Sequence, residues 1–145
     1  MSDTPAPADT GAPSKADKVF AYLAALLVLA VIVQFFLAGL GVWGIDQRKL
    51  DKATSLDPHR AVADLIALIA LLMFIAALVS RTSKPRIWVS ITIAILAAAV
   101  QSLLAAGGEH QHWVGGLHVL DGLVILGLAG WMHSSTRGLI GFMKK

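Results

Sequence analysis

The stretch "VFAYLAALLVLAVIVQFFLAGLGVWG" runs from Val19 to Gly44 and carries no charged residue. As an α-helix, this segment would be long enough to cross the roughly 30 Å hydrocarbon core of a bilayer, with length left for tilt. The whole chain has the same character, because 57% of its 145 residues are hydrophobic and its mean hydropathy is +0.73. A soluble domain of this size could not bury so much apolar surface, so the sequence predicts an integral membrane protein.

Three more apolar segments follow, over residues 57–80, 87–106 and 112–133. None alternates apolar and polar residues as the strand of a membrane barrel must, and backbone groups in lipid have to be paired within their own segment. In the second segment, Asp57 is the predicted N-cap and Pro58 the first helical residue. Short connections make successive helices antiparallel. The predicted fold is therefore all-α, a transmembrane four-helix up-down bundle.

The charged residues predict how the chain is divided and oriented. Residues 1–18 are expected to form a disordered cytoplasmic tail, residues 19–137 the transmembrane domain and residues 138–145 a short C-terminal tail. Eight basic residues fall on the side of the termini: Lys15, Lys18, Arg81, Lys84, Arg86, Arg137, Lys144 and Lys145. Four fall on the other: Arg48, Lys49, Lys52 and Arg60. This asymmetry predicts a multi-pass protein with both termini in the cytoplasm.

Two histidines stand out among the few polar residues inside the segments. His59 lies 22 residues before Arg81, about 33 Å of helix, and His118 lies 19 residues before Arg137, about 28 Å. The two side chains should therefore lie at similar depth, on helices that are diagonal partners in the bundle. Facing imidazoles are the axial-ligand arrangement of a noncovalent b-type haem. The chain has no cysteine, which excludes thiolate metal sites and covalent haem attachment.

Residues around this pair fit a flat macrocycle. Gly115, His118 and Gly122 share one helical stripe, and Gly39 thins the first helix at the same level. Arg60 is placed to meet haem propionates, and Asp121 could accept a hydrogen bond from a ligand imidazole. The predicted cofactor-binding residues are His59, His118, Arg60, Gly39, Gly115, Gly122 and Asp121, with His59 and His118 as the metal ligands.

Each feature also has a structural interpretation. Small residues commonly serve helix packing in membranes, and His59, near the predicted start of its helix, could be an interfacial histidine. His110 and His112 lie in a Gly-rich loop, where they would be solvated or bind a metal weakly. The glutamines Gln34 and Gln101 could hydrogen-bond across helices. They also give the two helical hairpins a pseudo-symmetry, since each hairpin has a Gln before its His.

Several of these segments resemble known membrane proteins. The runs "QFFLAGLG", "DPHRAVADLIALIALL" and "GGLHVLDGLVILGLAGW" look like a family of small uncharacterised four-span bacterial membrane proteins. That family implies a His-Pro-x-Asn pattern in the last helix, where this chain reads "HVLD". The layout is also similar to one four-helix half of haem A synthase, which implies haem ligands at the positions of His59 and His118. Gln34 stands where that enzyme has its helix-one glutamate.

The predicted function is electron transfer, or haem binding within a redox assembly, in a bacterial plasma membrane. The expected partners are the lipid bilayer and a quinone or redox protein subunit, within a larger membrane complex, and not nucleic acid. The sequence shows no nucleophile–base pair, so we do not expect the chain itself to be a catalyst. The alternatives are a haem-free accessory or structural subunit, and a small transporter or proton relay that uses Asp64, His118 and Asp121.

Overall fold

The computed structural model describes residues 13–137, apart from the side chains of Asp46, Arg48 and Ala53, and each regular element within that range is helical. The elements are α1 (Lys15–Arg48), α2 (Lys52–Val79), α3 (Lys84–Ile95), the π-helical segment η1 (Leu96–Val100), α4 (Gln101–Gly108) and α5 (His112–Thr136). Because α3, η1 and α4 follow one another without a break, they form one span. Four helices are thus long and apolar enough to cross a membrane, as predicted.

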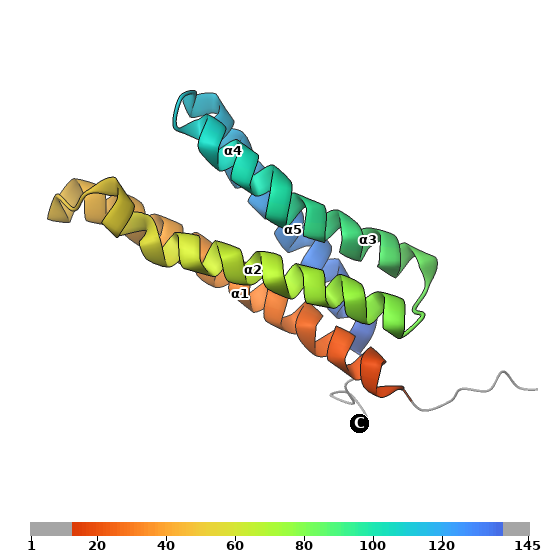
Figure 1. The fold of residues 1–145 in the computed structure, drawn as a ribbon. Coiled ribbons are helices and arrows are strands. Elements are labelled where there is room, and N and C mark those ends of the chain that lie inside the picture. The colour runs from red at the N-terminus through yellow and green to blue at the C-terminus, as the bar shows by residue number, and fades with distance from the viewer. Residues whose placement is uncertain (1–12, 138–145) are drawn as a thin grey trace, which may run out of the picture.

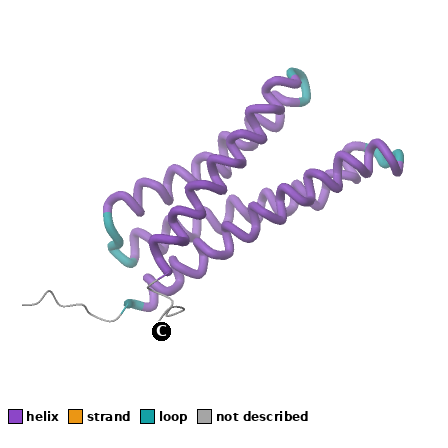
Figure 2. The backbone as a smooth tube through the Cα atoms, turned by 180° about the vertical axis from the view of Figure 1, so that it is seen from behind, coloured by secondary structure: helices purple, strands orange, loops and turns teal. Residues whose placement is uncertain are grey.

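The four spans form two helical hairpins, α1–α2 and α3/η1/α4–α5 (Figures 1 and 2). Helix α1 packs on α2 and α5, and α2 packs on α3 and η1, while α4 packs on α5. We call the end with residues 80–83, the start of α1 and the end of α5 the base, and the end with residues 49–51 and 109–111 the tip. The hairpins lie together at the base and diverge toward the tip. The predicted four-helix bundle is confirmed, and its tip is open.

The hydrophobic core fills the half of the bundle near the base. Its largest fully buried apolar side chains come from all four spans: Phe20, Leu27, Met73, Ile93 and Met132. Toward the tip the core ends at Val31, Ile66 and Ile125. Many large apolar side chains on the outer faces are exposed, including Trp43, Trp88 and Trp113 near span ends. This distribution fits contact with lipid, in which apolar side chains face outward.

Two helix starts differ from the prediction. Helix α1 begins at Lys15, because the Ser14 side chain accepts a hydrogen bond from the Asp17 backbone N–H and Asp17 caps Ser14 in return. Residues 15–18 are therefore helical and not part of a tail, while residues 1–12 and 138–145 lie outside the described residues. Helix α2 begins at Lys52, not at Pro58.

The predicted N-cap of α2, Asp57, is wrong, because the earlier Asp51 caps the helix. The Asp51 side chain accepts from the Thr54 backbone N–H at 2.9 Å, so the helix starts nearly two turns before Asp57. Pro58 lies inside the helix, where its ring cannot donate to the carbonyl four residues before it. As a result, His59 lies about two turns inside α2 and not at its first residues.

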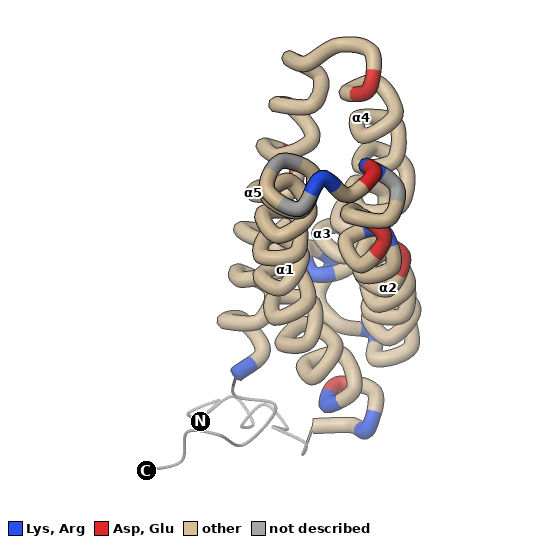
Figure 3. The backbone as a smooth tube through the Cα atoms, turned by 90° about the vertical axis from the view of Figure 1, so that its left-hand side faces the viewer, with Lys and Arg blue, Asp and Glu red and all other residues tan. Residues whose placement is uncertain are grey.

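Most charged residues lie near the ends of the spans, while Arg60, Asp64 and Asp121 lie within them. Figure 3 marks the charged residues on the backbone. At the base, the Arg86 Nη2 donates to the Ser135 carbonyl at 2.6 Å and so satisfies an orphan carbonyl at the end of α5. At the tip, Lys52 and Glu109 form an ion pair at 3.3 Å that joins the two hairpins. Both side chains are exposed, so the pair adds about 1 kcal/mol or less.

Candidate functional site

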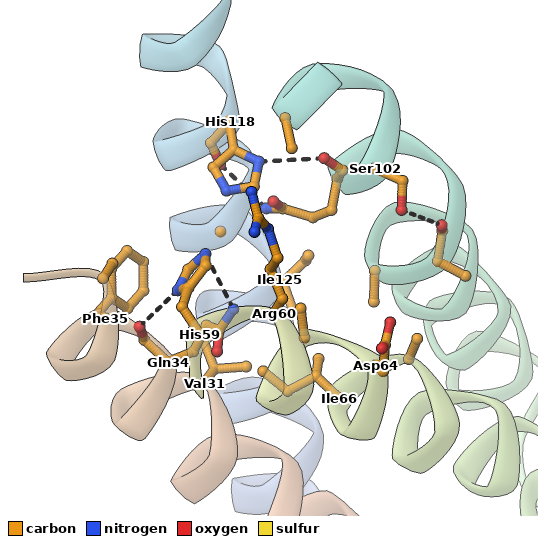
Figure 4. A pocket seen from close by; sticks show the side chains of 18 of the residues that line it. Val31, Gln34, Phe35, His59, Arg60, Asp64, Ile66, Ser102, His118 and Ile125 are labelled. Atoms are coloured by element: carbon orange, nitrogen blue, oxygen red, sulfur yellow. Dashed lines mark hydrogen bonds between the residues drawn. The ribbon is translucent and has the colours of Figure 1, made fainter. Parts of the chain in front are cut away.

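A cavity of about 540 Å³ opens where the two hairpins begin to diverge (Figure 4). This volume falls within the range of roughly 300–1,000 Å³ that is usual for ligand and cofactor sites. Val31, Ile66 and Ile125 of the core form its floor, so the packed base fixes the position of the cavity. Small side chains make up much of the wall: Ala38, Ala63, Ala67, Ala97, Ala98, Ser102, Ala105 and Gly122.

The two predicted histidines meet in this cavity. His59 comes from α2 and His118 from α5, which stand diagonally across the bundle. Their ring centroids are 6.2 Å apart and the ring planes are inclined by 61°. Figure 4 shows both rings pointing into the space between the hairpins from opposite sides. The prediction that they lie at one level is therefore confirmed.

Each ring is held by a backbone carbonyl of the helix that precedes it. His59 Nδ1 lies 3.3 Å from the Gln34 carbonyl oxygen, and His118 Nδ1 lies 3.2 Å from that of Gln101. A carbonyl oxygen only accepts, so Nδ1 must be the protonated nitrogen of both neutral rings. The lone pair is then on Nε2. This is the tautomer and the type of support found for histidines that ligate a metal through Nε2.

The two glutamine side chains break this symmetry. The Gln34 amide Nε2 donates to His59 Nε2 at 3.3 Å, whereas the Gln101 amide Nε2 donates to the His118 backbone carbonyl at 3.1 Å. The Gln34 Oε1 atom is buried and has no hydrogen-bond partner. The Nε2 lone pair of His59 thus accepts a hydrogen bond from the Gln34 amide, while the Gln101 amide makes no hydrogen bond to the His118 ring.

The spacing of the rings suits a metal between them. Two imidazoles that bind one metal from opposite sides, with bonds of about 2 Å, have ring centroids about 6.3 Å apart. Within residues 13–137 there is no group of three or more His, Cys, Asp or Glu side chains that could hold a metal ion. A pair of histidines therefore suits a metal whose remaining ligands come from a macrocycle, as in haem.

Not all of the predicted site residues reach the cavity. Arg60 and Gly122 line it together with the histidines. Gly39 is exposed, and a Cβ there would meet nothing within 4 Å, because that face of α1 turns away from the other helices. Gly115 instead packs against Gly108, where a Cβ added to Gly108 would lie 2.9 Å from the Gly115 Cα. Its role is the close approach of α4 and α5.

Asp121 has a different place from the one predicted. It is not among the residues that line the cavity, and the bond from His118 Nδ1 goes to the Gln101 carbonyl. The Asp121 Oδ2 atom is buried without a hydrogen-bond partner. Elsewhere, His110 and His112 are exposed at the tip, and His133 is half-buried near the base, so none of the three belongs to the cavity.

One contribution to the site had no signal in the sequence. The π-helical segment η1 reads "LAAAV" and ends directly before Gln101, whose backbone N–H bonds to the Leu96 carbonyl. Such single-turn π segments change which residues face a neighbouring helix and are frequent at functional sites. Here the segment precedes the residue whose carbonyl holds His118. An Ala-rich run predicts only a helix, so neither the segment nor the carbonyl contact could be predicted.

The fold and the cavity define the class of this chain as a multi-pass, four-helix membrane protein. The chain belongs to the family of unknown function DUF6220, whose profile matches residues 34–107, about half of the sequence. The matched region includes Gln34, His59 and Gln101 and ends before His118. Comparison with curated proteins and with solved structures gave no match. The resemblance to haem A synthase therefore stays a prediction.

Proposed function

We propose that the protein binds one noncovalent b-type haem, with His59 and His118 as its two axial ligands. The observation that carries the proposal is the pair of rings, 6.2 Å apart on diagonal helices. Each ring donates through Nδ1 to a backbone carbonyl and so presents Nε2 as the ligating nitrogen. Haem iron held in this way supplies one-electron transfer.

The rest of the cavity supports the same ligand. The small side chains of its wall, such as Ala63 and Ala67 next to His59, leave space for a flat aromatic ring. Arg60 lies on the same wall, and its guanidinium also meets Asp57 at 3.5 Å. An exposed guanidinium at the rim of an apolar cavity suits the carboxylates of haem propionates.

We infer that the protein works with a partner. The site lies on the tip side of the core, and a spanning helix must cross a hydrocarbon layer of about 30 Å. A single haem on one side cannot carry electrons across that layer. A quinone or a redox subunit of a larger membrane complex would provide the other step. The distribution of basic residues supports a bacterial plasma membrane location with both termini in the cytoplasm and the haem near the outer face.

The proposal is tested by purifying the full chain in detergent after expression with an adequate haem supply. The wild type is expected to show sharp α and Soret bands in a reduced-minus-oxidised spectrum. His118→Ala should lower the bound haem per chain by about tenfold or more, and His59→Ala should lower it as well, because each removes one of two metal bonds. His133→Ala is the matched control, since His133 belongs to α5 but lies away from the cavity.

The opposite results would favour the other assignments. A colourless wild type with intact helical content would contradict haem binding and leave a haem-free accessory subunit. Haem retained in both alanine variants would show that the haem binds at a site other than this histidine pair.

A further inference from the structure

We propose that His59 is an exchangeable ligand and His118 a permanent one, so that the site takes up a small neutral diatomic ligand on the His59 side. The inference rests on the proposed haem site and extends it from electron transfer to binding of a gas molecule. It names Gln34 as the positioning residue that sets this difference. The two hairpins are alike in the backbone support of their histidines and unlike in the side-chain contacts at the ring nitrogens.

The backbone support is the same in both halves. In each hairpin, a carbonyl of the first helix accepts a hydrogen bond from Nδ1 of the histidine on the second helix, at 3.3 Å for His59 and 3.2 Å for His118. Both rings are therefore held by the same kind of backbone hydrogen bond. Any difference in their strength as ligands has to come from side chains.

The side chains differ at the atom that would bind the metal. Gln34 donates to Nε2 of His59, whereas the equivalent Gln101 donates to the backbone carbonyl of His118. Since one lone pair cannot serve an amide N–H and a metal together, ligation by His59 requires the loss of the Gln34 bond. Ligation by His118 requires no such loss. The competing bond is long at 3.3 Å, which is a contact that can be broken.

Burial increases the cost of that exchange. The Gln34 Oε1 atom is already buried without a hydrogen-bond partner. If His59 turned its lone pair to a metal, the amide N–H would lose its acceptor as well, and an unpaired buried donor is unfavourable. The Gln34 amide thus favours return of the His59 ring to its hydrogen bond with Gln34 on α1. Ala63 and Ala67 on the same wall leave room for a diatomic molecule when the ring withdraws.

Carbon monoxide is the probe for this proposal. The purified, haem-loaded wild type, reduced with dithionite, is expected to bind carbon monoxide and show the shifted Soret band of the adduct. Gln34→Met removes the amide donor at similar length and should strengthen ligation by His59. The apparent affinity for carbon monoxide should then fall by about three- to tenfold, the value of one hydrogen bond. Gln101→Met removes the equivalent amide of the other hairpin, which bonds the His118 backbone carbonyl and not a ring nitrogen, and should lower that affinity less than Gln34→Met does.

The possible failures can be told apart. A wild type without bound haem overturns the proposed function itself. A haem-loaded wild type that does not bind carbon monoxide overturns only the exchangeable ligand. Equal effects of Gln34→Met and Gln101→Met, with haem content unchanged in both, also overturn it, because only the Gln34 amide contacts a ring nitrogen of its histidine. His118→Ala should lose haem before any comparison of carbon monoxide binding is made.

Discussion

Gly122 sets the width of the cavity at the level of the histidines. A Cβ at this position would lie 3.2 Å from the Phe35 Cζ and 3.5 Å from the Gln101 Nε2. A larger side chain would therefore occupy the cavity and push on α1. We predict that Gly122→Leu lowers bound haem per chain by about fivefold or more, since overpacking costs about 1–3 kcal/mol. The measurement is the Soret absorbance per chain.

Gly127→Leu is the control for this change. Gly127 is on the same helix, and a Cβ there would meet nothing within 4 Å. Both substitutions favour helix formation equally. A loss of haem in the two variants to the same extent would show that the effect is not specific to the cavity wall.

At the scale of single residues, the sequence predicted that His59 and His118 meet and missed what holds their rings. The number of residues to the basic end of each helix is enough to place His59 and His118 at one depth. The carbonyls of Gln34 and Gln101 belong to the backbone, which every residue has, so no pattern marks them. Asp121 was predicted as the support for His118 because carboxylates commonly take this role, and a nearer carbonyl takes it here.

At the scale of elements, the α4–α5 hairpin depends on a close approach of two glycines. A Cβ added to Gly108 would lie 2.9 Å from the Gly115 Cα, closer than side chains are found in proteins. We predict that Gly108→Leu destabilises the folded protein by about 1–3 kcal/mol. Thermal unfolding in detergent measures this effect.

Gly116→Leu provides the comparison for the hairpin, because a Cβ at Gly116 would meet nothing within 4 Å. An unchanged melting temperature for Gly108→Leu would contradict the importance of the close approach. The sequence predicted Gly115 as a cofactor contact, since small residues serve packing and cofactor access equally well. Only the path of α4 shows which of the two applies.

At the scale of the whole molecule, the absence of cysteine allows a clean test of orientation. Gln111→Cys places a thiol in the tip loop and Ser83→Cys places one before α3, at the base. We predict that a membrane-impermeant maleimide labels Gln111→Cys in intact cells and Ser83→Cys only after lysis, because the basic residues favour a cytoplasmic base. Labelling of Ser83→Cys alone in intact cells would reverse the orientation.

The number of spans and their antiparallel order followed from apolar length and short connections, and both were predicted. The divergence of the hairpins was not. It depends on how far the core extends, and the core stops at Val31, Ile66 and Ile125, while α4 packs on α5 and away from α1 and α2. Apolar residues continue beyond that level in every span, so hydropathy alone cannot distinguish residues that face the core from those that face lipid or a cavity.

The most direct measurement is the reduced-minus-oxidised spectrum of the purified wild type, together with its haem content per chain. A bundle whose two hairpins share one metal should give sharp low-spin bands and about one haem per chain, the number that a single pair of axial histidines can hold. A colourless protein, or one whose bound haem is entirely high-spin, would contradict the joint ligation of one haem by His59 and His118.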